Sequence, residues 1–332
     1  MQSFLPSGVL DAFIEGYLRS DASGESGGSE PTGRIELVPH RNGKTVFELR
    51  YLDYGLIAKV YDDIRDGALA FEVWHTLWSE GFGPDAIFKV PEPLIYLPEH
   101  RTFLMELASG TCLLPLVLRD RNACIEGMRH AARWLAALHV LPVRAGAVDN
   151  SARILYRLAR KLVRTAASCP ELEGTIVKIV SELERRGEAY LSAGSQPLVQ
   201  THGRYHCGHV YVTPGAVTVI DMDRSAPADP AKDVAEFLCR FRIDASKEAI
   251  KRRLVDDLGA VGTRIFVEEY DRAGAPRLPG LLFYWSATLL GLLADTAQKR
   301  HLDDDIRNAR LAYYDSEFAE LPELVANLSH RT

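Results

Sequence analysis

The chain has 332 residues, of which 47% are hydrophobic, so it can bury a large core as one two-lobed domain or as two domains. Its formal net charge of −6 at pH 7 argues against a general nucleic-acid binder, because such proteins normally carry a basic surplus. Five scattered cysteines without a C-x-x-C pair indicate reduced thiols rather than a disulfide framework or a zinc site. The N-terminus lacks the basic and continuously apolar regions of a signal peptide. We therefore expect a cytoplasmic protein without nucleic-acid or membrane partners.

The N-terminal third is predicted to be rich in strands. The amphipathic pattern of Val9–Leu18 predicts a helix, and the Gly- and Ser-rich stretch Asp21–Gly33 predicts a flexible loop. Two strand-like segments flank Arg41–Lys44, whose Asn-Gly pair is a strong hairpin signal. The other expected elements of this part are one helix, Asp66–Trp78, and five strands, Arg34–His40, Thr45–Leu52, Leu56–Tyr61, Leu94–Leu97 and Thr102–Leu107.

From Cys112 onward, apolar residues recur at helical spacing. The exception is a predicted hairpin of Val210–Val212 with Val217–Asp221, turning at Pro214-Gly215. The apolar run Leu278–Ala294 is interrupted by polar residues and glycines, so it predicts a buried helix and not a membrane span. The pattern predicts an α+β protein with a strand-rich lobe before a helical one. The expected helices are Leu113–Leu118, Ala123–Leu141, Ala152–Thr165, Leu172–Ala193, Pro230–Arg240, Lys247–Leu258, Ile265–Arg272, Pro279–Arg300 and Asp304–Phe318.

The segment from His202 to Phe237 contains the most informative pattern of the chain. It orders a His-Gly loop, a short hairpin, an Ile-Asp strand end and an Asp-Pro-Ala-x-x-Asp helix start. This order resembles the phosphotransfer core of the aminoglycoside phosphotransferase and choline kinase group, the small-molecule branch of the kinase-like fold. The resemblance implies a bilobal kinase-like α+β fold. Residues 1–107 would form a nucleotide-binding lobe, and residues 108–332 a helical lobe with the catalytic loop and the acceptor site.

The resemblance also implies where ATP would bind. Lys59, in an apolar strand, resembles the kinase-like lysine that contacts the α- and β-phosphates, although a strand lysine can equally extend to solvent. Glu72, in the next predicted helix, is the expected partner of that lysine, with Glu80 as the weaker competitor. The backbone of Glu106, Leu107 and Ala108 resembles the hinge that receives the adenine.

The metal-binding residues implied by the resemblance are carboxylates at the end of a strand. Asp221 resembles the metal-binding aspartate of the family, and Asp223 follows two residues later, so the two carboxylates could share one Mg²⁺. His209 stands where the family carries the asparagine that supports the metal. An imidazole can ligate a metal, but it suits Mg²⁺ less well than oxygen does. A strand-terminal aspartate can also simply form a turn.

The catalytic loop departs from the family pattern. Arg204 occupies the place of the aspartate that accepts or orients the hydroxyl proton, and a guanidinium stays protonated and has no lone pair. Arg204 could instead bind a phosphate or pair with an aspartate. His202, His206 and Asp223 are the remaining candidate catalytic residues, and for His206 a purely structural role is the simpler interpretation.

Other polar residues of this lobe have structural interpretations. Asp229 can cap the helix that follows it, and Asp233 resembles an aspartate that supports the catalytic loop from beneath. Asp303–Asp305 with Glu268, Glu269 and Asp271 could form an acidic wall at the acceptor site. Such runs are more often solvated helix ends.

Three functions stay open on the sequence. The first is an ATP-dependent phosphotransferase acting on a small-molecule hydroxyl, with Mg²⁺ as the metal. The second is a catalytically inactive, pseudokinase-like protein that binds a nucleotide or another ligand, since two catalytic-loop residues differ at once. The third is a nucleotidyl transferase on the same fold. The motifs of P-loop enzymes, α/β-hydrolases and zinc proteases are absent from the sequence, which names neither the acceptor nor the oligomeric state.

Overall fold

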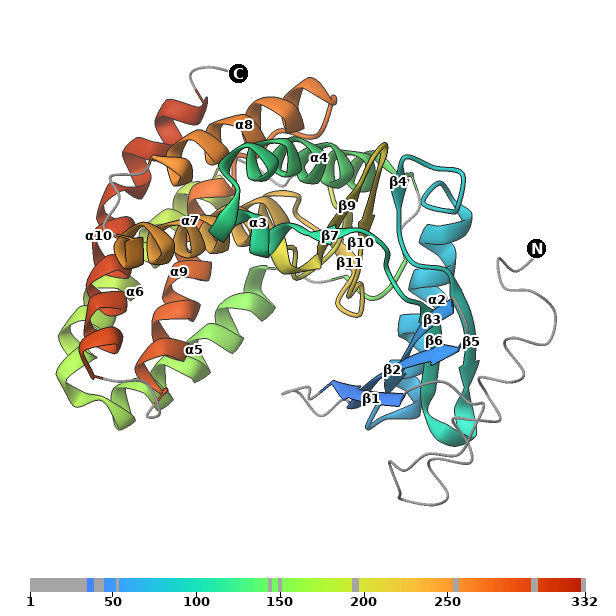
Figure 1. Cartoon of the computed structure of the whole chain (residues 1–332). Helices are drawn as coiled ribbons and strands as arrows, with labels where there is room; N and C mark the ends of the chain where they lie inside the picture. Colours follow the sequence, from blue (N-terminus) through green and yellow to red (C-terminus); the bar gives the residue numbers. More distant parts are fainter. Residues whose placement is uncertain are drawn as a thin grey trace. The chain divides into compact units, whose positions relative to one another are not determined.

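The computed structural model describes residues 35–38, 45–51, 54–142, 145–148, 151–192, 197–252, 257–299 and 304–329. The described residues divide into two compact units. The first unit extends to Thr111 and also takes in Tyr211–Asp223, and the second comprises Cys112–Val210 with the residues from Arg224 onward. Most strands belong to the first unit, and the long helices other than α2 belong to the second (Figure 1).

A five-stranded antiparallel sheet with the order β1-β2-β3-β6-β5 forms the main part of the first unit. Strands β1 and β2 pair with Val38 opposite Val46, as a hairpin requires, although Arg41–Lys44 itself lies outside the described residues. Val9–Leu18 and Asp21–Gly33 also lie outside them. The strands are β1 (Ile35–Val38), β2 (Thr45–Tyr51), β3 (Tyr54–Val60), β5 (Pro93–Leu97) and β6 (Thr102–Glu106).

A second sheet, with the order β4-β10-β9-β7, explains why residues far along the chain belong to the first unit. Its strands are β4 (Phe88–Lys89), β7 (Thr111–Cys112), β9 (Val210–Thr213) and β10 (Ala216–Val219). The predicted hairpin is present as β9 and β10, and Gly215 in its turn adopts a φ of 86°, a conformation that glycine favours. Because β10 pairs in parallel with β4, the end of the hairpin reaches the first unit.

Helix α2 (Ile64–Ser79) packs against β5 and β6. Asp63 caps its N-terminus by accepting a hydrogen bond from the amide of Arg65. The buried residues of α2 recur at helical spacing, and they are Gly67, Ala70, Val73, Trp74 and Leu77. The indole of Trp74 is fully buried and donates to the carbonyl of Pro91 at 2.8 Å, so this helix is fixed in rotation against the sheet.

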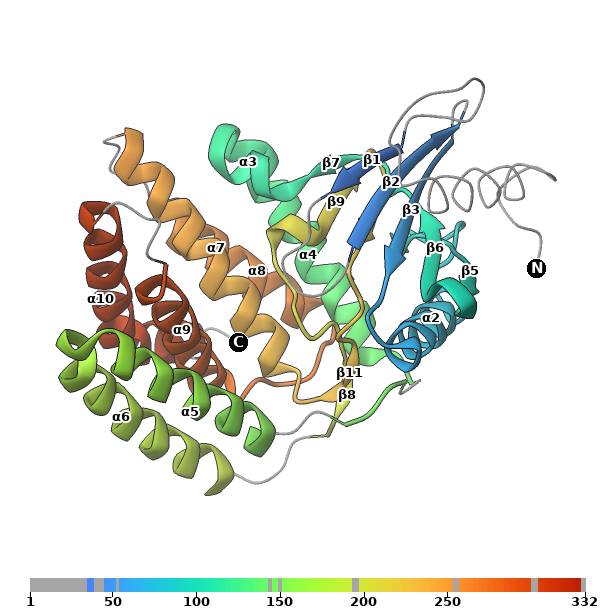
Figure 2. The ribbon, with the colours of Figure 1, turned by 90° about the horizontal axis from the view of Figure 1, so that it is seen from below.

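The second unit is built around α4, α7 and α9, against which the other long helices pack. Figure 2 shows α5 and α6 lying side by side next to α9. Two short strands, β8 (Val199–Thr201) and β11 (Ala226–Ala228), form a separate antiparallel ladder. The helices are α3 (Leu113–Arg119), α4 (Arg121–Val140), α5 (Ser151–Ser168), α6 (Glu173–Ser192), α7 (Ala231–Arg252), α8 (Leu258–Arg272), α9 (Leu281–Ala297) and α10 (Asp304–Ser329).

The helices predicted within the described residues are present, with clearly different ends in three places. Helix α7 runs on to Arg252 and merges two predicted helices, α8 begins at Leu258 rather than at Ile265, and α10 continues past Pro322 to Ser329. The four short strands β4, β7, β8 and β11 were not predicted, because two or three residues carry no periodicity. As expected, α9 is a buried helix. Among the helices of the described residues, none has both the length and the apolarity needed to cross a bilayer.

Candidate functional site

The predicted site residues fall into two groups that belong to different units, so each group is described on its own. The group in the first unit comprises Lys59, Glu72, Glu106, Leu107, Ala108, Asp221 and Asp223, and the group in the second comprises His202, Arg204, His206 and His209.

In the first unit, one buried lysine lies between two carboxylates. The Nζ atom of Lys59 is 2.8 Å from Oδ1 of Asp221 and 3.1 Å from Oδ1 of Asp223. Lys59 is 7% exposed, so an unpaired ammonium would be costly there. Strand β3 supplies the lysine, and the segment after β10 supplies both aspartates.

Electrostatics and local geometry both favour this cluster. Burial alone would lower the pKa of Lys59, but the neighbouring carboxylates of Asp223 and Asp221 outweigh it and hold the pKa above its ordinary value. The Lys59 ammonium also lies 5.3 Å from the ring centre of Trp74. Asp221 has a φ of 67°, which a short polar side chain tolerates better than most. Because the two carboxylates keep its pKa raised, Lys59 stays charged at neutral pH.

Tyr61 adds a phenol to the same cluster. Its ring is 1% exposed, and burial beside Asp223 and Asp221 raises the pKa of the phenol far above its ordinary value. Sequence reasoning missed Tyr61, although it follows Lys59 by two residues and so lies on the same face of the extended segment.

The predicted pairing of Lys59 with Glu72 is not present in the described structure. Glu72 is exposed, and the carboxylates within reach of Lys59 are those of Asp221 and Asp223. The apolar flanks of Glu72 suggested burial, but helical rotation of about 100° per residue puts Glu72 about 200° away from buried Trp74. The competing candidate, Glu80, is also exposed at the end of α2.

The predicted hinge follows β6. Two of its amides already donate to backbone carbonyls, Glu106 to Glu92 at 3.0 Å and Leu107 to Gly55 at 2.9 Å. Gly55 has no room for a side chain, since a Cβ atom there would lie 2.6 Å from Cδ2 of Leu107. Within the described structure, Ala108 is thus the first hinge residue whose amide is not used by the sheet.

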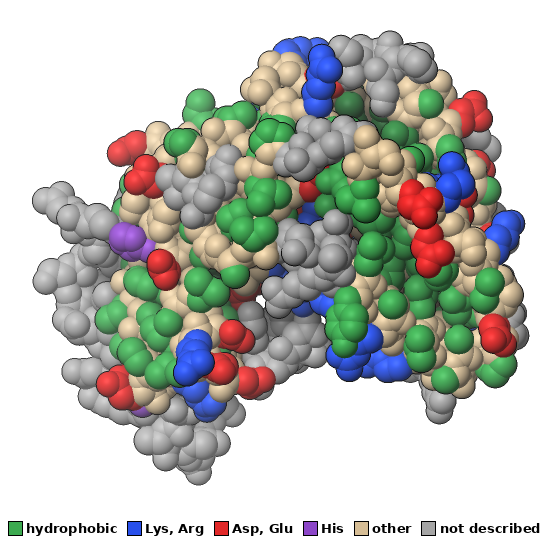
Figure 3. All heavy atoms as spheres, turned by 180° about the vertical axis from the view of Figure 1, so that it is seen from behind, with side chains coloured by type: hydrophobic (Ala, Val, Ile, Leu, Met, Phe, Trp, Pro, Cys, Tyr) green, Lys and Arg blue, Asp and Glu red, His purple; other side chains and the backbone are tan. Residues whose placement is uncertain are grey.

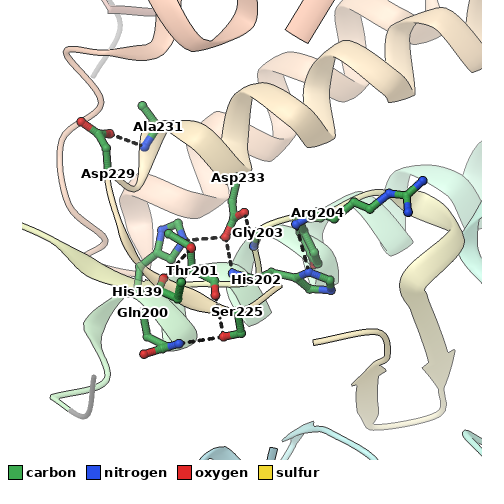
Figure 4. Close-up of polar contacts among 12 residues, drawn as sticks. His139, Gln200, Thr201, His202, Gly203, Arg204, Ser225, Asp229, Ala231 and Asp233 are labelled. Atoms are coloured by element: carbon green, nitrogen blue, oxygen red, sulfur yellow. Dashed lines mark hydrogen bonds and ion pairs between the residues drawn. The ribbon is translucent and has the colours of Figure 1, made fainter. Parts of the chain in front are cut away.

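In the second unit, a buried aspartate holds the catalytic loop. The carboxylate of Asp233 accepts the amide of His202 at 2.5 Å and the amide of Gly203 at 2.8 Å (Figure 4). Its Oδ2 atom also lies 3.4 Å from Nε2 of His139. Burial alone would raise the pKa of this carboxyl, but the interaction with His139 outweighs it and lowers the pKa. The predicted supporting role of Asp233 is confirmed.

Sequence reasoning missed two residues beneath Asp233. His139, from α4, and Tyr270, from α8, are buried and joined by 2.6 Å between Nδ1 and the phenol oxygen. The polar contacts from Asp233 to His139 and from His139 to Tyr270 link helices α7, α4 and α8 under the loop. A lone histidine or tyrosine in an amphipathic helix gave no signal of this role.

The three histidines of the loop form part of its framework. His202 is fully buried, so in this conformation it supports the loop rather than touching a substrate. Nδ1 of His206 accepts a hydrogen bond from the amide of Gly208 at 3.1 Å. Nδ1 therefore carries no proton, and the ring proton is on Nε2. Nδ1 of His209 lies 3.0 Å from the carbonyl of Arg204, so Nδ1 carries a proton, and in the neutral ring the lone pair is on Nε2.

Arg204 is half-buried, and its guanidinium points away from His202 and Asp233 in Figure 4. Its amide is 3.4 Å from Nδ1 of His202, so its backbone belongs to the ordered loop. The loop therefore keeps its backbone support while its side chain at this position is a cation instead of an acceptor.

Gly203 is required by this loop. Its φ is 80°, and a Cβ atom there would lie 2.1 Å from the carbonyl oxygen of Arg224. We expect Gly203→Ala to lower the free energy of unfolding by about 2–4 kcal/mol, from backbone strain and from the displaced turn at Arg224. Urea unfolding measures this loss, and Gly174→Ala in α6, where a Cβ atom has open space, is the matched control that should not destabilise. Equal stability of the two variants would contradict the prediction.

Two carboxylates of the predicted acidic wall are paired with arginines. Glu269 is 5% exposed and pairs with Arg133 at 2.7 Å and with Arg272, and these arginines lower its pKa against the effect of burial. Glu268 lies 3.9 Å from Arg264. Asp303 is outside the described residues, as are the side chains of the two aspartates that follow it. Glu269 thus joins α8 to α4, because Arg133, one of its two arginine partners, comes from α4.

Asp229 caps α7 as predicted, accepting the amide of Ala231 at 2.7 Å (Figure 4). It also accepts a hydrogen bond from the phenol of Tyr190. Across the described part of the chain, no three His, Cys, Asp or Glu side chains come together as a metal cluster. The pair Asp221 and Asp223 still fits Mg²⁺, which is commonly bound by one or two carboxylates with the remaining oxygens supplied by substrate phosphates and water.

The comparisons with known proteins agree with this architecture. Residues 55–274 match the phosphotransferase enzyme family (APH). No functionally curated protein matches the sequence. A choline/ethanolamine kinase family protein from Mesorhizobium loti superposes with a TM-score of 0.61 at 16% identity, covering 91% of this chain and 93% of that one.

Two aminoglycoside phosphotransferases are similarly related in structure. APH(4)-Ia gives a TM-score of 0.59 at 13% identity over 95% of this chain and 99% of that one. ADP-bound APH(2'')-Ib gives 0.58 at 12% identity over 92% and 98%. Identities this low establish the kinase-like α+β fold alone, and that predicted fold is confirmed. Since the family match spans 220 of the 332 residues, counted from 55 to 274, the chain belongs to the phosphotransferase enzyme family.

Proposed function

We propose that the protein binds ATP with Mg²⁺ and transfers a phosphoryl group to the hydroxyl of a small molecule. The observation that carries the proposal is the buried contact of Lys59 with Asp221 and Asp223. A cation and two carboxylates in one buried cluster are what phosphoryl transfer requires of a protein, since the chemistry depends on positioning and charge neutralisation. The nucleotide-bound relative APH(2'')-Ib supports ATP as the ligand by analogy.

In this proposal the ammonium of Lys59 binds phosphate oxygens of the nucleotide, and Asp221 and Asp223 hold Mg²⁺. The metal, when bound, neutralises the charge of the phosphates. Hinge groups at Glu106–Ala108 receive the adenine, with the amide of Ala108 as the available donor. Glu72 has no part in it, because its exposed side chain does not contact Lys59.

The acceptor hydroxyl needs a group with a lone pair, and Arg204 cannot provide one. We propose Nε2 of His209 for this role, because the carbonyl of Arg204 holds the proton on Nδ1. Asp223 is the alternative acceptor. Arg204 then contributes positive charge toward the transferred group and leaves proton transfer to its neighbours.

The test is transfer of the labelled γ-phosphate from ATP to a panel of small alcohols, amino alcohols and sugars. We expect wild type to transfer slowly, and Arg204→Asp to transfer faster by about 10²–10⁴-fold, which is the usual range for a positioned general base. The matched control is Arg277→Asp, at an exposed position of the same unit that has no assigned role. Absence of transfer by both wild type and Arg204→Asp, with ATP bound, would reject the proposal.

A second function is favoured by the cation at position 204. A protein that binds nucleotide without transferring phosphate would keep the Lys59 cluster and the loop support from Asp233 while losing the acceptor side chain. It predicts ATP binding with no labelled product for wild type. Nucleotidyl transfer would instead release pyrophosphate and leave AMP on the product, which the same assay detects.

A further inference from the structure

The face of the protein drawn in Figure 3 exposes Asp, Glu, Lys and Arg side chains to water. The interior of the second unit holds a group of polar side chains that water does not reach. Asp233 and Tyr270 are 0% exposed and His139 is 1% exposed. Buried polar groups are costly unless each finds a hydrogen-bond partner, so the direction of every hydrogen bond in this group has consequences for the others.

One placement of the protons gives each of these side chains its partner. Nε2 of His139 lies 3.4 Å from Oδ2 of Asp233, and a lone pair there would be repelled by the carboxylate, so Nε2 carries a proton. Nδ1 lies 2.6 Å from the phenol oxygen of Tyr270. In the described part of the chain this phenol has no other acceptor, so its proton is satisfied only by Nδ1. The phenol therefore donates to Nδ1, and the imidazole is neutral.

The two end groups of this arrangement have pKa values that suit their roles. Burial raises the pKa of the Tyr270 phenol well above its ordinary value, so the phenol keeps the proton that it donates. Burial acts to raise the pKa of Asp233 as well, but the interaction with His139 outweighs it and the carboxyl stays ionised. Figure 4 shows the imidazole beside this carboxylate.

A single oxygen connects the arrangement to the catalytic loop. Oδ2 of Asp233, which faces His139, is also the atom that accepts the amide of His202 at 2.5 Å. The ring of His202 stacks on that of His209, with ring centres 5.4 Å apart and planes at 8°. A rotation of the His139 ring would therefore disturb the acceptor that holds His202, and through it the ring of His209.

From this we infer that Tyr270 is a positioning residue: it holds Nδ1 of His139 so that the Nε2 proton is directed at Asp233, and it thereby fixes the catalytic loop without reaching the substrate. The effect on phosphoryl transfer rests on the proposed function. The placement of the protons and the ordering of the loop do not.

The protons are located by ¹⁵N NMR of the histidine rings, with the His139 signals assigned by through-bond correlation. We expect wild type to carry the proton on Nε2 and a hydrogen-bonded lone pair on Nδ1. Tyr270→Phe removes the oxygen alone and keeps the ring, which packs against His139 and Phe266. Its Nδ1 signal should move to that of a nitrogen without a hydrogen bond. A proton on Nδ1 in wild type, with or without one on Nε2, would overturn the inference.

Labelled phosphoryl transfer measures the effect on the loop. Tyr270→Phe should lower kcat at least about tenfold, since small misplacements of reacting groups are costly, and leave KM for ATP unchanged. The matched control is Tyr314→Phe. Tyr314 is 4% exposed and its phenol lies 3.2 Å from the hydroxyl of Thr296, a contact that joins α10 to α9 and does not involve the loop. This variant loses the same atom from a similarly buried site and should keep its kcat. Equal kcat in the two variants would overturn the inference.

Hydrogen exchange separates a failure of this inference from a failure of the proposed function. The amides of His202 and Gly203 should exchange faster in Tyr270→Phe than in Tyr314→Phe, because only the first variant loosens Asp233. If wild type transfers no phosphate, the proposed function fails, and exchange together with the ¹⁵N signals still decides the role of Tyr270. Equal exchange in the two variants would overturn that role, whether or not wild type is active.

Discussion

Replacing Asp233 with Ala is expected to destabilise the helical unit by about 3–5 kcal/mol, since it removes a buried charge that other buried groups depend on. The carboxylate accepts two loop amides, from His202 and Gly203, and lies beside His139. Asp233, His139 and His202 are buried and Gly203 is half-buried, so water cannot fully replace the lost acceptor. Urea unfolding followed by fluorescence measures the loss, and near wild-type stability of the variant would contradict the role given to Asp233.

The variant Asp233→Asn separates charge from shape. It keeps one acceptor oxygen, so its loss should be smaller than that of the alanine variant. Because the pKa of Asp233 is lowered below its ordinary value of 3.8, the charge stabilises the folded state at neutral pH. That contribution is fully present above the unfolded pKa and is lost as pH falls through the lower folded pKa. The stability gap between wild type and Asp233→Asn should therefore be constant near pH 7 and shrink only in strong acid.

Replacing Asp221 with Ala is expected to reduce Mg²⁺-dependent ATP binding by at least about 100-fold. Asp221 is one of the two carboxylates available to the metal in the Lys59 cluster, and Asp223 alone must then neutralise the lysine. The fold should persist, because Lys59 keeps one buried partner. Calorimetric titration of ATP with and without Mg²⁺ measures the effect, and Asp85→Ala, at an exposed position of the same unit, is the control.

A variant with the opposite charge change sharpens this test. In the nucleotide-free protein the Lys59 ammonium neutralises both carboxylates, so it competes with a metal for the same oxygens. Lys59→Met should bind Mg²⁺ more tightly than wild type without ATP, and bind ATP more weakly. If neither affinity responds to either substitution, the metal does not bind at Asp221 and Asp223.

The sequence predicts best those features in which a residue contacts or shapes the backbone next to it. The cap at Asp229 and the turn at Gly215 depend on short-range geometry, and both predictions are confirmed. The loop support from Asp233 joins residues 31 positions apart, and it was expected from the family resemblance alone. The failure at Glu72 has a different cause. Glu72 has apolar neighbours in sequence that are not its neighbours in space, because the rotation of α2 directs Glu72 to solvent.

Partners that lie far apart in sequence were beyond local patterns. Lys59 and Asp221 are 162 residues apart in the sequence. The pairing of β10 with β4 brings the segment that carries Asp221 and Asp223 into the first unit. His139 and Tyr270 likewise meet only because α4 and α8 pack together. Composition also does not reveal which carboxylates of the expected acidic wall, such as Glu269, are paired with arginines.

The return of the chain to its first unit has a consequence for biosynthesis. Residues up to Thr111 leave the ribosome long before Tyr211–Asp223, which complete the second sheet and carry both counter-ions of Lys59. Until Asp223 has been made, the nascent first unit holds a lysine that cannot be buried at low cost. This unit is therefore completed late although it is translated early, and a fragment ending at Thr111 should not fold stably on its own.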